Sequence, residues 1–99
     1  MNLMLSEIAD YVGGVLFGED RVVTGVSIDT RTIEPGNLYC AIKGERFDGN
    51  DFVGDAEQAG ATAAILSHKV EVTMPIIVVP DTRLALAELA GYWRNRQSA

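Results

Sequence analysis

Two uninterrupted apolar runs constrain the fold of this 99-residue chain more than any other feature of its sequence. They are TAAILS at residues 62–67 and PIIVVP at residues 75–80, and each has the length of a β-strand. A strand that faces water on one side alternates apolar and polar residues, whereas a strand covered on both sides has no need of polar positions. The two runs therefore predict a sheet with helices packed on both faces, which is an α/β fold.

Two further segments have the composition of strands. Residues 22–28 (VVTGVSI) are rich in β-branched side chains, and residues 37–43 (NLYCAIK) form another mainly apolar run. Because successive side chains of a strand point to opposite faces, the second run has two expected faces. They are Leu38, Cys40 and Ile42 on one side, and Tyr39 and Ala41 on the other.

Three segments space their apolar residues as amphipathic helices do. The first begins near Ser6, the expected N-cap, and ends at the glycine pair of residues 13–14. The second covers residues 51–59, and the third begins at Asp81 or Thr82. The side chains expected to face the core are Leu5, Ile8, Ala9 and Val12 in the first helix, Phe52, Ala56 and Ala59 in the second, and Leu86, Leu89, Ala90 and Trp93 in the third.

The order of these segments predicts a mixed β-sheet in a three-layer α/β/α sandwich. A chain of this length can build one hydrophobic core, so we expect a single domain over residues 1–97. Residues 98–99 are expected to begin a linker to a further domain.

Charge and cysteine content argue against several kinds of partner. The 14 acidic and 8 basic side chains give a net charge of −6, which opposes approach to nucleic acids and to anionic membranes. No apolar stretch approaches the roughly 18 residues that a membrane span needs. Cys40 is the single cysteine, so the chain cannot form an internal disulfide or a paired-cysteine metal site. We expect a cytoplasmic protein that binds no nucleic acid, membrane or metal.

The sequence contains no complete catalytic site. It lacks a glycine-rich phosphate loop ending in Lys-Ser or Lys-Thr, and it lacks a dinucleotide fingerprint. His68, the single histidine, has no neighbour suited to orient it, and neither Ser27 nor Ser67 has a nearby base. We therefore expect a binding role, carried by the loops that follow the strands.

Two polar loops flank the strand predicted at residues 37–43. Residues 29–31 (DTR) form the first, and residues 43–50 (KGERFDGN) form the second. Basic side chains of the second loop, Lys43 and Arg46, can meet anionic oxygens, while Phe47 can pack beside a planar base. Glycines of that loop, Gly44 and Gly49, allow backbone N–H groups to approach a ligand.

The same residues also fit a purely structural interpretation. Asp29 can accept a backbone hydrogen bond within a turn and leave Arg31 on the surface. Similarly, Asp48 and Gly49 can form a tight turn while Phe47 fills the core. The residues alone leave both interpretations open for both loops.

Three strings carry a resemblance to a known family. DTRTIEPGNLYCAIKGERFDGNDF, QAGATAAIL and VVPDTRLALAELAGYWR resemble the N-terminal domain of the Mur ligases, in order and in spacing, over nearly the whole chain. KGERFDG and LAELAGYWR resemble the type that adds D-alanyl-D-alanine, although the sister ligase that adds the third amino acid shares several features. Two positions depart from the family: Asn50 replaces a common histidine, and Cys40 replaces a common valine.

The resemblance implies a domain that holds the UDP end of UDP-N-acetylmuramoyl-tripeptide. It assigns the uridine and diphosphate contacts to Ile28, Thr30, Arg31, Gly44, Glu45, Arg46 and Phe47, and the shaping of the loops to Asp29, Lys43, Asp48 and Gly49. It places ATP, magnesium and D-alanyl-D-alanine in further domains beyond residue 99. This chain alone is therefore expected to hold no cofactor, to be monomeric and to catalyse nothing.

A shared uridine site imposes a condition on the topology. If residues 22–28 and 37–43 formed a tight antiparallel hairpin, the two loops would lie about 20 Å apart, at opposite ends of the strands. We therefore predict that residues 29–36 return the chain, with Ile33 facing inward and a turn at residues 35–36 (Pro-Gly). Both strands would then end at the same edge of the sheet.

Two other classes of function remain open. One is a free-standing uridine nucleotide-binding module, which would have the same site without ligase domains. The other is a structural module that dimerises through an apolar patch, with Tyr92 and Trp93 of the last helix as candidates.

Overall fold

The computed structural model of the chain describes residues 2–42 and 52–98, except for the side chains of residues 93 and 95–98. The elements in chain order are β1 (Leu3–Met4), α1 (Leu5–Val12), β2 (Val15–Phe17), β3 (Val22–Val23), β4 (Gly25–Ser27), β5 (Asn37–Cys40), α2 (Val53–Gln58), β6 (Ala63–Leu66), β7 (Ile76–Val78) and α3 (Thr82–Ser98). A five-stranded sheet has the order β2-β7-β6-β5-β4, and a small sheet pairs β1 with β3.

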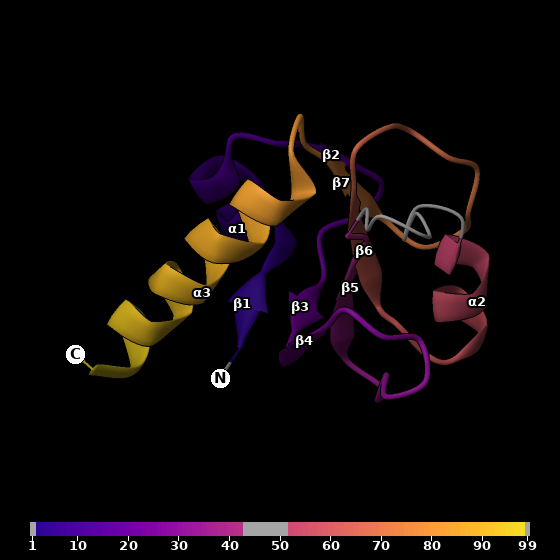
Figure 1. The fold of residues 1–99 in the computed structure, drawn as a ribbon, viewed down its shortest axis with the longest axis horizontal. Coiled ribbons are helices and arrows are strands. Elements are labelled where there is room, and N and C mark those ends of the chain that lie inside the picture. Colours follow the sequence, from indigo (N-terminus) through magenta and orange to yellow (C-terminus); the bar gives the residue numbers. More distant parts are fainter. Residues whose placement is uncertain (1, 43–51, 99) are drawn as a thin grey trace.

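The main sheet lies between two layers of helices. Helices α1 and α3 cover one face, and α2 covers the other, as Figure 1 shows. Leu38, Ile65 and Ile77 point toward α1 and α3, where they are fully buried, whereas Tyr39 and Leu66 point toward α2. The three-layer α/β/α prediction and the two faces predicted for residues 37–43 are therefore confirmed.

The sheet is mixed, as predicted, but its antiparallel strand was not predicted. Strands β4, β5, β6 and β7 are parallel, and β2 pairs antiparallel with β7, with Val15 opposite Val78. β2 has only three residues, and it exposes Val15 and Phe17 while Leu16 packs on the core. Such a short edge strand offers too few residues for its alternation to be recognised in the sequence.

The strand predicted over residues 22–28 is wrong as a single element. Val22 and Val23 pair with β1, whereas Gly25 to Ser27 pair with β5, so the chain changes sheets at Thr24. The N–H of Thr24 donates to the carbonyl of Gly36 at 3.0 Å. A β-branched composition favours an extended backbone, but it does not determine which other strand the segment pairs with.

The predicted N-cap of the first helix is also wrong. Met4 occupies that position, and its N–H donates to the Glu7 carboxylate at 3.1 Å. Ser6 lies in the first turn, where its N–H and hydroxyl donate to Asp20 at 3.0 and 2.6 Å. These hydrogen bonds hold the pKa of Asp20 below its usual value. A carboxylate 14 residues away thus satisfies the helix terminus, which local sequence rules do not anticipate.

The other helices agree with the predictions in part. Asp81 accepts hydrogen bonds from the N–H groups of Arg83 and Leu84, which confirms the N-cap of α3. Leu89 is buried as predicted, and Leu86 is partly buried on the same core. Three predicted core positions, Phe52, Ala59 and Ala90, are exposed instead, and Val53 and Ala85 take buried positions. Val53 takes the place of its neighbour Phe52 on the core face of α2, and Ala85 adds to the core face of α3.

The C-terminal part of the chain is helical up to Ser98. The division of the chain at residue 97 stays a prediction. No helix in the described residues is long and apolar enough to cross a membrane. Tyr92, a candidate for a dimer contact, is engaged within the chain: its ring stacks on Tyr11 with centroids 4.3 Å apart, and its hydroxyl donates to Glu7 at 3.2 Å.

Candidate ligand-binding site

The connection between β4 and β5 brings their C-terminal ends to one edge of the sheet. The strands are parallel, with Ser27 opposite Tyr39 in the register. The return turn lies at residues 34–37, where the N–H of Asn37 donates to the carbonyl of Glu34 at 3.0 Å. Ile33 packs partly buried against the α2 side of the sheet. The returning connector, the inward Ile33 and the parallel strands are therefore confirmed.

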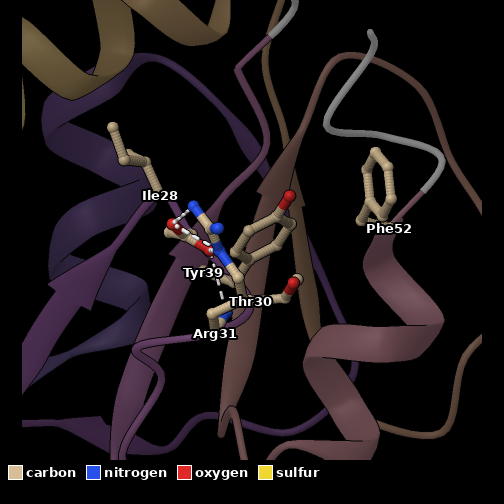
Figure 2. A pocket seen from close by; sticks show the side chains of 6 residues that line it. Ile28, Thr30, Arg31, Tyr39 and Phe52 are labelled. Carbon is tan, nitrogen blue, oxygen red and sulfur yellow. Dashed lines mark hydrogen bonds and ion pairs between the residues drawn. The ribbon is translucent and has the colours of Figure 1, made fainter.

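A pocket of about 420 Å³ opens at this edge. Its lining residues are Ile28, Asp29, Thr30, Arg31, Tyr39 and Phe52. Figure 2 shows Ile28 and Phe52 at opposite sides, with Arg31 and Tyr39 between them. The volume lies within the usual range for small-molecule sites, and the lining combines apolar rings with a few polar groups, as such sites do.

The structure brings together the predicted residues of the first loop. Ile28, Asp29, Thr30 and Arg31 all line the pocket. The predicted residues of the second loop lie outside the described residues, and their place in the site stays a prediction: Lys43, Gly44, Glu45, Arg46, Phe47, Asp48 and Gly49.

Two aromatic residues of the pocket were not predicted as site residues. Phe52 precedes α2 and is 37% exposed, whereas Tyr39 is only 2% exposed and lies opposite Ser27 in β5. The sequence did carry a signal for Tyr39, because an aromatic residue near the end of a strand beside a polar loop is well placed to line a ligand site. The apolar spacing of residues 51–59 instead predicts Phe52 on the core face of a helix.

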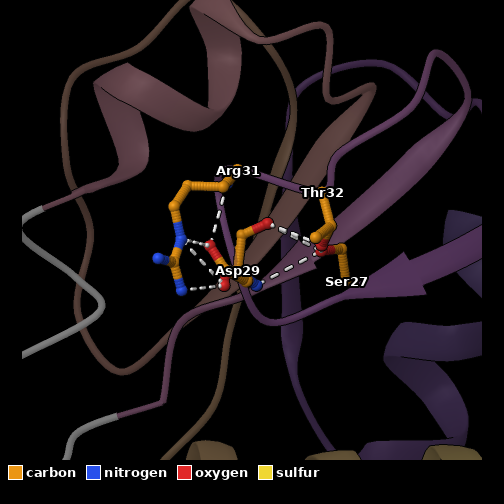
Figure 3. Close-up of polar contacts among 4 residues, drawn as sticks. All are labelled: Ser27, Asp29, Arg31 and Thr32. Atoms are coloured by element: carbon orange, nitrogen blue, oxygen red, sulfur yellow. Dashed lines mark hydrogen bonds and ion pairs between the residues drawn. The ribbon is translucent and has the colours of Figure 1, made fainter.

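Hydrogen bonds within the first loop hold its backbone in place (Figure 3). The Ser27 hydroxyl donates to the carbonyl of Asp29 at 2.9 Å and lies 3.1 Å from the Thr32 hydroxyl. The N–H of Thr32 donates to the same carbonyl at 3.1 Å. Ser27 is buried, so these bonds fix the end of β4 and the turn that follows it.

Asp29 and Arg31, which both line the pocket, form an ion pair. The Asp29 carboxylate accepts the backbone N–H of Arg31 at 2.9 Å, and it accepts the guanidinium Nη2 at 2.7 Å. These two hydrogen bonds, the side-chain one first, lower the pKa of Asp29 from 3.8 to about 2. The turn with a surface arginine, one of the two interpretations that the sequence left open, is therefore present, and the pocket contains the same residues.

We expect the Asp29 carboxyl to titrate with a midpoint of about 2 when its carbon signal is followed by NMR. The pKa is lowered in the folded state, so the pair adds stability above the ordinary pKa near 4 and loses that contribution as the pH falls toward 2. Arg31→Gln should raise the midpoint toward 3.8, with a remainder left by the backbone bond. A wild-type midpoint near 3.8 would contradict the pairing.

Thr30 presents the free polar groups of the pocket. Neither its N–H nor its hydroxyl has a hydrogen-bond partner among residues 2–42 and 52–98. Groups of this kind are available to a ligand without the loss of an internal bond.

The described residues contain neither an exposed thiol nor a cluster of metal ligands. The buried Cys40 thiol has a pKa raised to about 12 by burial, so it is not a nucleophile at neutral pH. Among the residues that the structure describes, no group of three or more His, Cys, Asp or Glu side chains could hold a metal ion.

Comparisons with known proteins show which family the chain is similar to. A family model described as "Mur ligase family, catalytic domain" matches residues 22–94. The UDP-N-acetylmuramoyl-tripeptide--D-alanyl-D-alanine ligase of Escherichia coli (strain K12) is 40% identical over 99 residues, which are 100% of this chain and 22% of the relative. The UDP-N-acetylmuramoyl-L-alanyl-D-glutamate--2,6-diaminopimelate ligase of Aquifex aeolicus (strain VF5) is 41% identical over 76 residues, which are 77% of this chain and 16% of that relative.

A solved structure shows the same fold. The crystal structure of MurF from Acinetobacter baumannii matches with a TM-score of 0.87 and 28% identity, covering 97% of this chain and 22% of that one. This chain therefore spans about a fifth of the length of its full-length relatives. Since the family model matches most of the chain and the fold agrees over almost all of it, the chain belongs to the Mur ligase family.

Proposed function

We propose that this chain binds the UDP end of UDP-N-acetylmuramoyl-tripeptide, as part of a longer ATP-dependent ligase that adds D-alanyl-D-alanine to peptidoglycan precursors. The observation that carries the proposal is the pocket at the shared end of β4 and β5, which Thr30 and Arg31 line together with two aromatic residues, Tyr39 and Phe52. The names of the relatives include a UDP-linked substrate, and this combination of groups suits its uridine and diphosphate.

Each part of the ligand has matching groups in the pocket. A flat uracil ring fits against the aromatic side chains of Tyr39 and Phe52. The diphosphate carries negative charge and suits Arg31 together with the N–H and hydroxyl of Thr30. The resemblance adds Gly44, Glu45, Arg46 and Phe47 as further proposed contacts.

The D-alanyl-D-alanine-adding type is favoured over its sister ligase by the extent of the matches. The E. coli relative of the first type aligns with all 99 residues at 40% identity, whereas the diaminopimelate ligases align with 73 to 95 residues at 33 to 41% identity. The MurF structure covers 97% of the chain. The full reaction would activate the carboxylate of the tripeptide as an acyl phosphate, and the amine of D-alanyl-D-alanine would then attack it. The family resemblance places ATP and magnesium in further domains, so we assign no step of that reaction to this chain.

Binding by this chain alone should be weak, because the remaining substrate contacts would lie in other domains. The net charge of −6 opposes long-range attraction of a diphosphate, but close hydrogen bonds decide the bound state. We propose that the longer protein acts as a monomer in the cytoplasm.

Titration with UDP tests the proposal. We expect backbone amide shifts at residues 28–31 in NMR spectra, and Thr30→Val should weaken binding about fivefold, because it removes one hydrogen bond and keeps the side-chain shape. Thr24→Val is the matched control, since Thr24 is exposed and lies outside the pocket. Unchanged spectra at millimolar UDP would refute the proposed function.

A further inference from the structure

The ion pair between Asp29 and Arg31 leaves one edge of the guanidinium open. The Nε donates to both carboxylate oxygens at 3.1 and 3.2 Å, and Nη2 donates to one of them at 2.7 Å. The Nη1 group has no hydrogen-bond partner within the described part of the chain. A guanidinium has five N–H donors in a fixed plane, so a carboxylate on one edge sets the direction of the other edge.

Fold stability does not account for this pair. The Arg31 side chain is 87% exposed, and exposed ion pairs contribute little to stability. The turn is already held by the hydrogen bonds that join Ser27, the Asp29 carbonyl and Thr32. A second pair in the same chain, Glu19 with Arg21, has the same sequence separation and lies outside the pocket.

We infer that Asp29 is a positioning residue, which holds the Arg31 guanidinium so that its open edge faces an anionic group of the ligand. The inference rests on the proposed function, because the anion is taken to be the diphosphate of UDP. This role goes beyond shaping the loop. An asparagine at position 29 could shape the turn equally well, because its side-chain oxygen can accept the same backbone N–H, but it would not carry the charge that holds Arg31.

Two effects of the Asp29 charge oppose each other. The carboxylate repels an incoming diphosphate, but that repulsion acts through water and is screened by salt. The carboxylate also fixes a long side chain that would otherwise lose its rotamer freedom on binding. We expect the second effect to be larger, so removal of the charge should weaken the binding of the anionic ligand.

The test compares Asp29→Asn with the wild-type chain for two ligands, UDP and uridine. The asparagine Oδ1 can still accept the N–H of Arg31, so the turn should persist. We expect UDP to bind about threefold to tenfold more weakly, with little change for uridine. Glu19→Gln removes the same charge from the matched pair and should leave both affinities unchanged.

Each outcome has a defined meaning. If wild-type chain binds UDP and Asp29→Asn binds it equally or more tightly, the positioning role is overturned and the proposed function stands. If wild-type chain does not bind UDP, both are overturned. Relaxation of the Arg31 Nε–H signal in the ligand-free wild-type chain is an independent readout that needs no variant: order close to that of the backbone supports the role, and free motion overturns it.

Discussion

Replacing Ile65 with alanine should lower the free energy of unfolding by about 2 to 5 kcal/mol. Ile65 is fully buried in β6, the central strand of the main sheet, and its register partners are Cys40 in β5 and Ile77 in β7. Its side chain packs in the core beneath α1 and α3. Alanine would lose the transfer free energy of the removed methyl groups and leave a cavity that the close-packed neighbours would fill only in part.

Urea denaturation measures this loss directly. A domain of this size is stable by about 5 to 15 kcal/mol, so the variant should show a much lower midpoint. Leu84→Ala is the control, because Leu84 is 58% exposed on α3 and should change stability by less than about 0.5 kcal/mol. Equal effects of the two substitutions would mean that the sheet is not covered on the face that carries Ile65.

Gly36→Ala should destabilise the chain by about 1 to 3 kcal/mol. Gly36 follows Pro35 in the turn that returns the chain to β5, and its φ of 93° is a conformation that side chains disfavour. An added Cβ would also lie 2.6 Å from the Thr24 hydroxyl oxygen. The turn fixes the register of β4 and β5, so its distortion should also disturb the pocket.

The same substitution at another glycine should have the opposite sign. Gly54 lies in α2, and nothing lies within 4 Å of an added Cβ there. Gly54→Ala should therefore stabilise the chain by about 0.5 to 1 kcal/mol, because alanine is the better helix former. Thermal and urea unfolding of both variants measure the difference. If alanine destabilised the chain equally at Gly36 and at Gly54, the positive φ of Gly36 in the turn would be contradicted.

The layers of the fold are predictable from the sequence because a strand that is buried on both faces consists of apolar residues. Residues 63–66 and 75–80 lack polar side chains, and the strands that they contain, β6 and β7, are covered by helices. The turn at residues 34–37 was also predictable, because proline and glycine act on the backbone of their own residues. The parallel arrangement of β4 and β5 was predictable from the condition that the loops at residues 29–31 and 43–50 contact the same ligand.

The wrong predictions concern choices that depend on distant residues. The division of residues 22–28 between two sheets depends on partners in β1 and β5, which are far apart in the sequence. The start of α1 depends on Asp20, whose carboxylate reaches Ser6 across the chain. Local propensity contains neither contact, so neither could be deduced from the segment alone.

Some residues of the candidate site can be predicted from their own segment, and others depend on distant contacts. Residues 28–31 were predicted and line the pocket, because a polar loop after a strand can be recognised from its own residues. The part played by Tyr39 and Phe52 depends on the register of β4 against β5 and on where α2 begins. Those two features place apolar rings beside the polar loop, and only the folded chain shows them.

The position of the bound uracil ring decides whether this chain binds uridine diphosphate between β4, β5 and the start of α2. Intermolecular nuclear Overhauser effects from the uracil H5 and H6 protons of bound UDP measure that position. We expect contacts with the rings of Tyr39 and Phe52. Contacts confined to another surface, such as the exposed face of α3 at Leu84, would contradict this expectation.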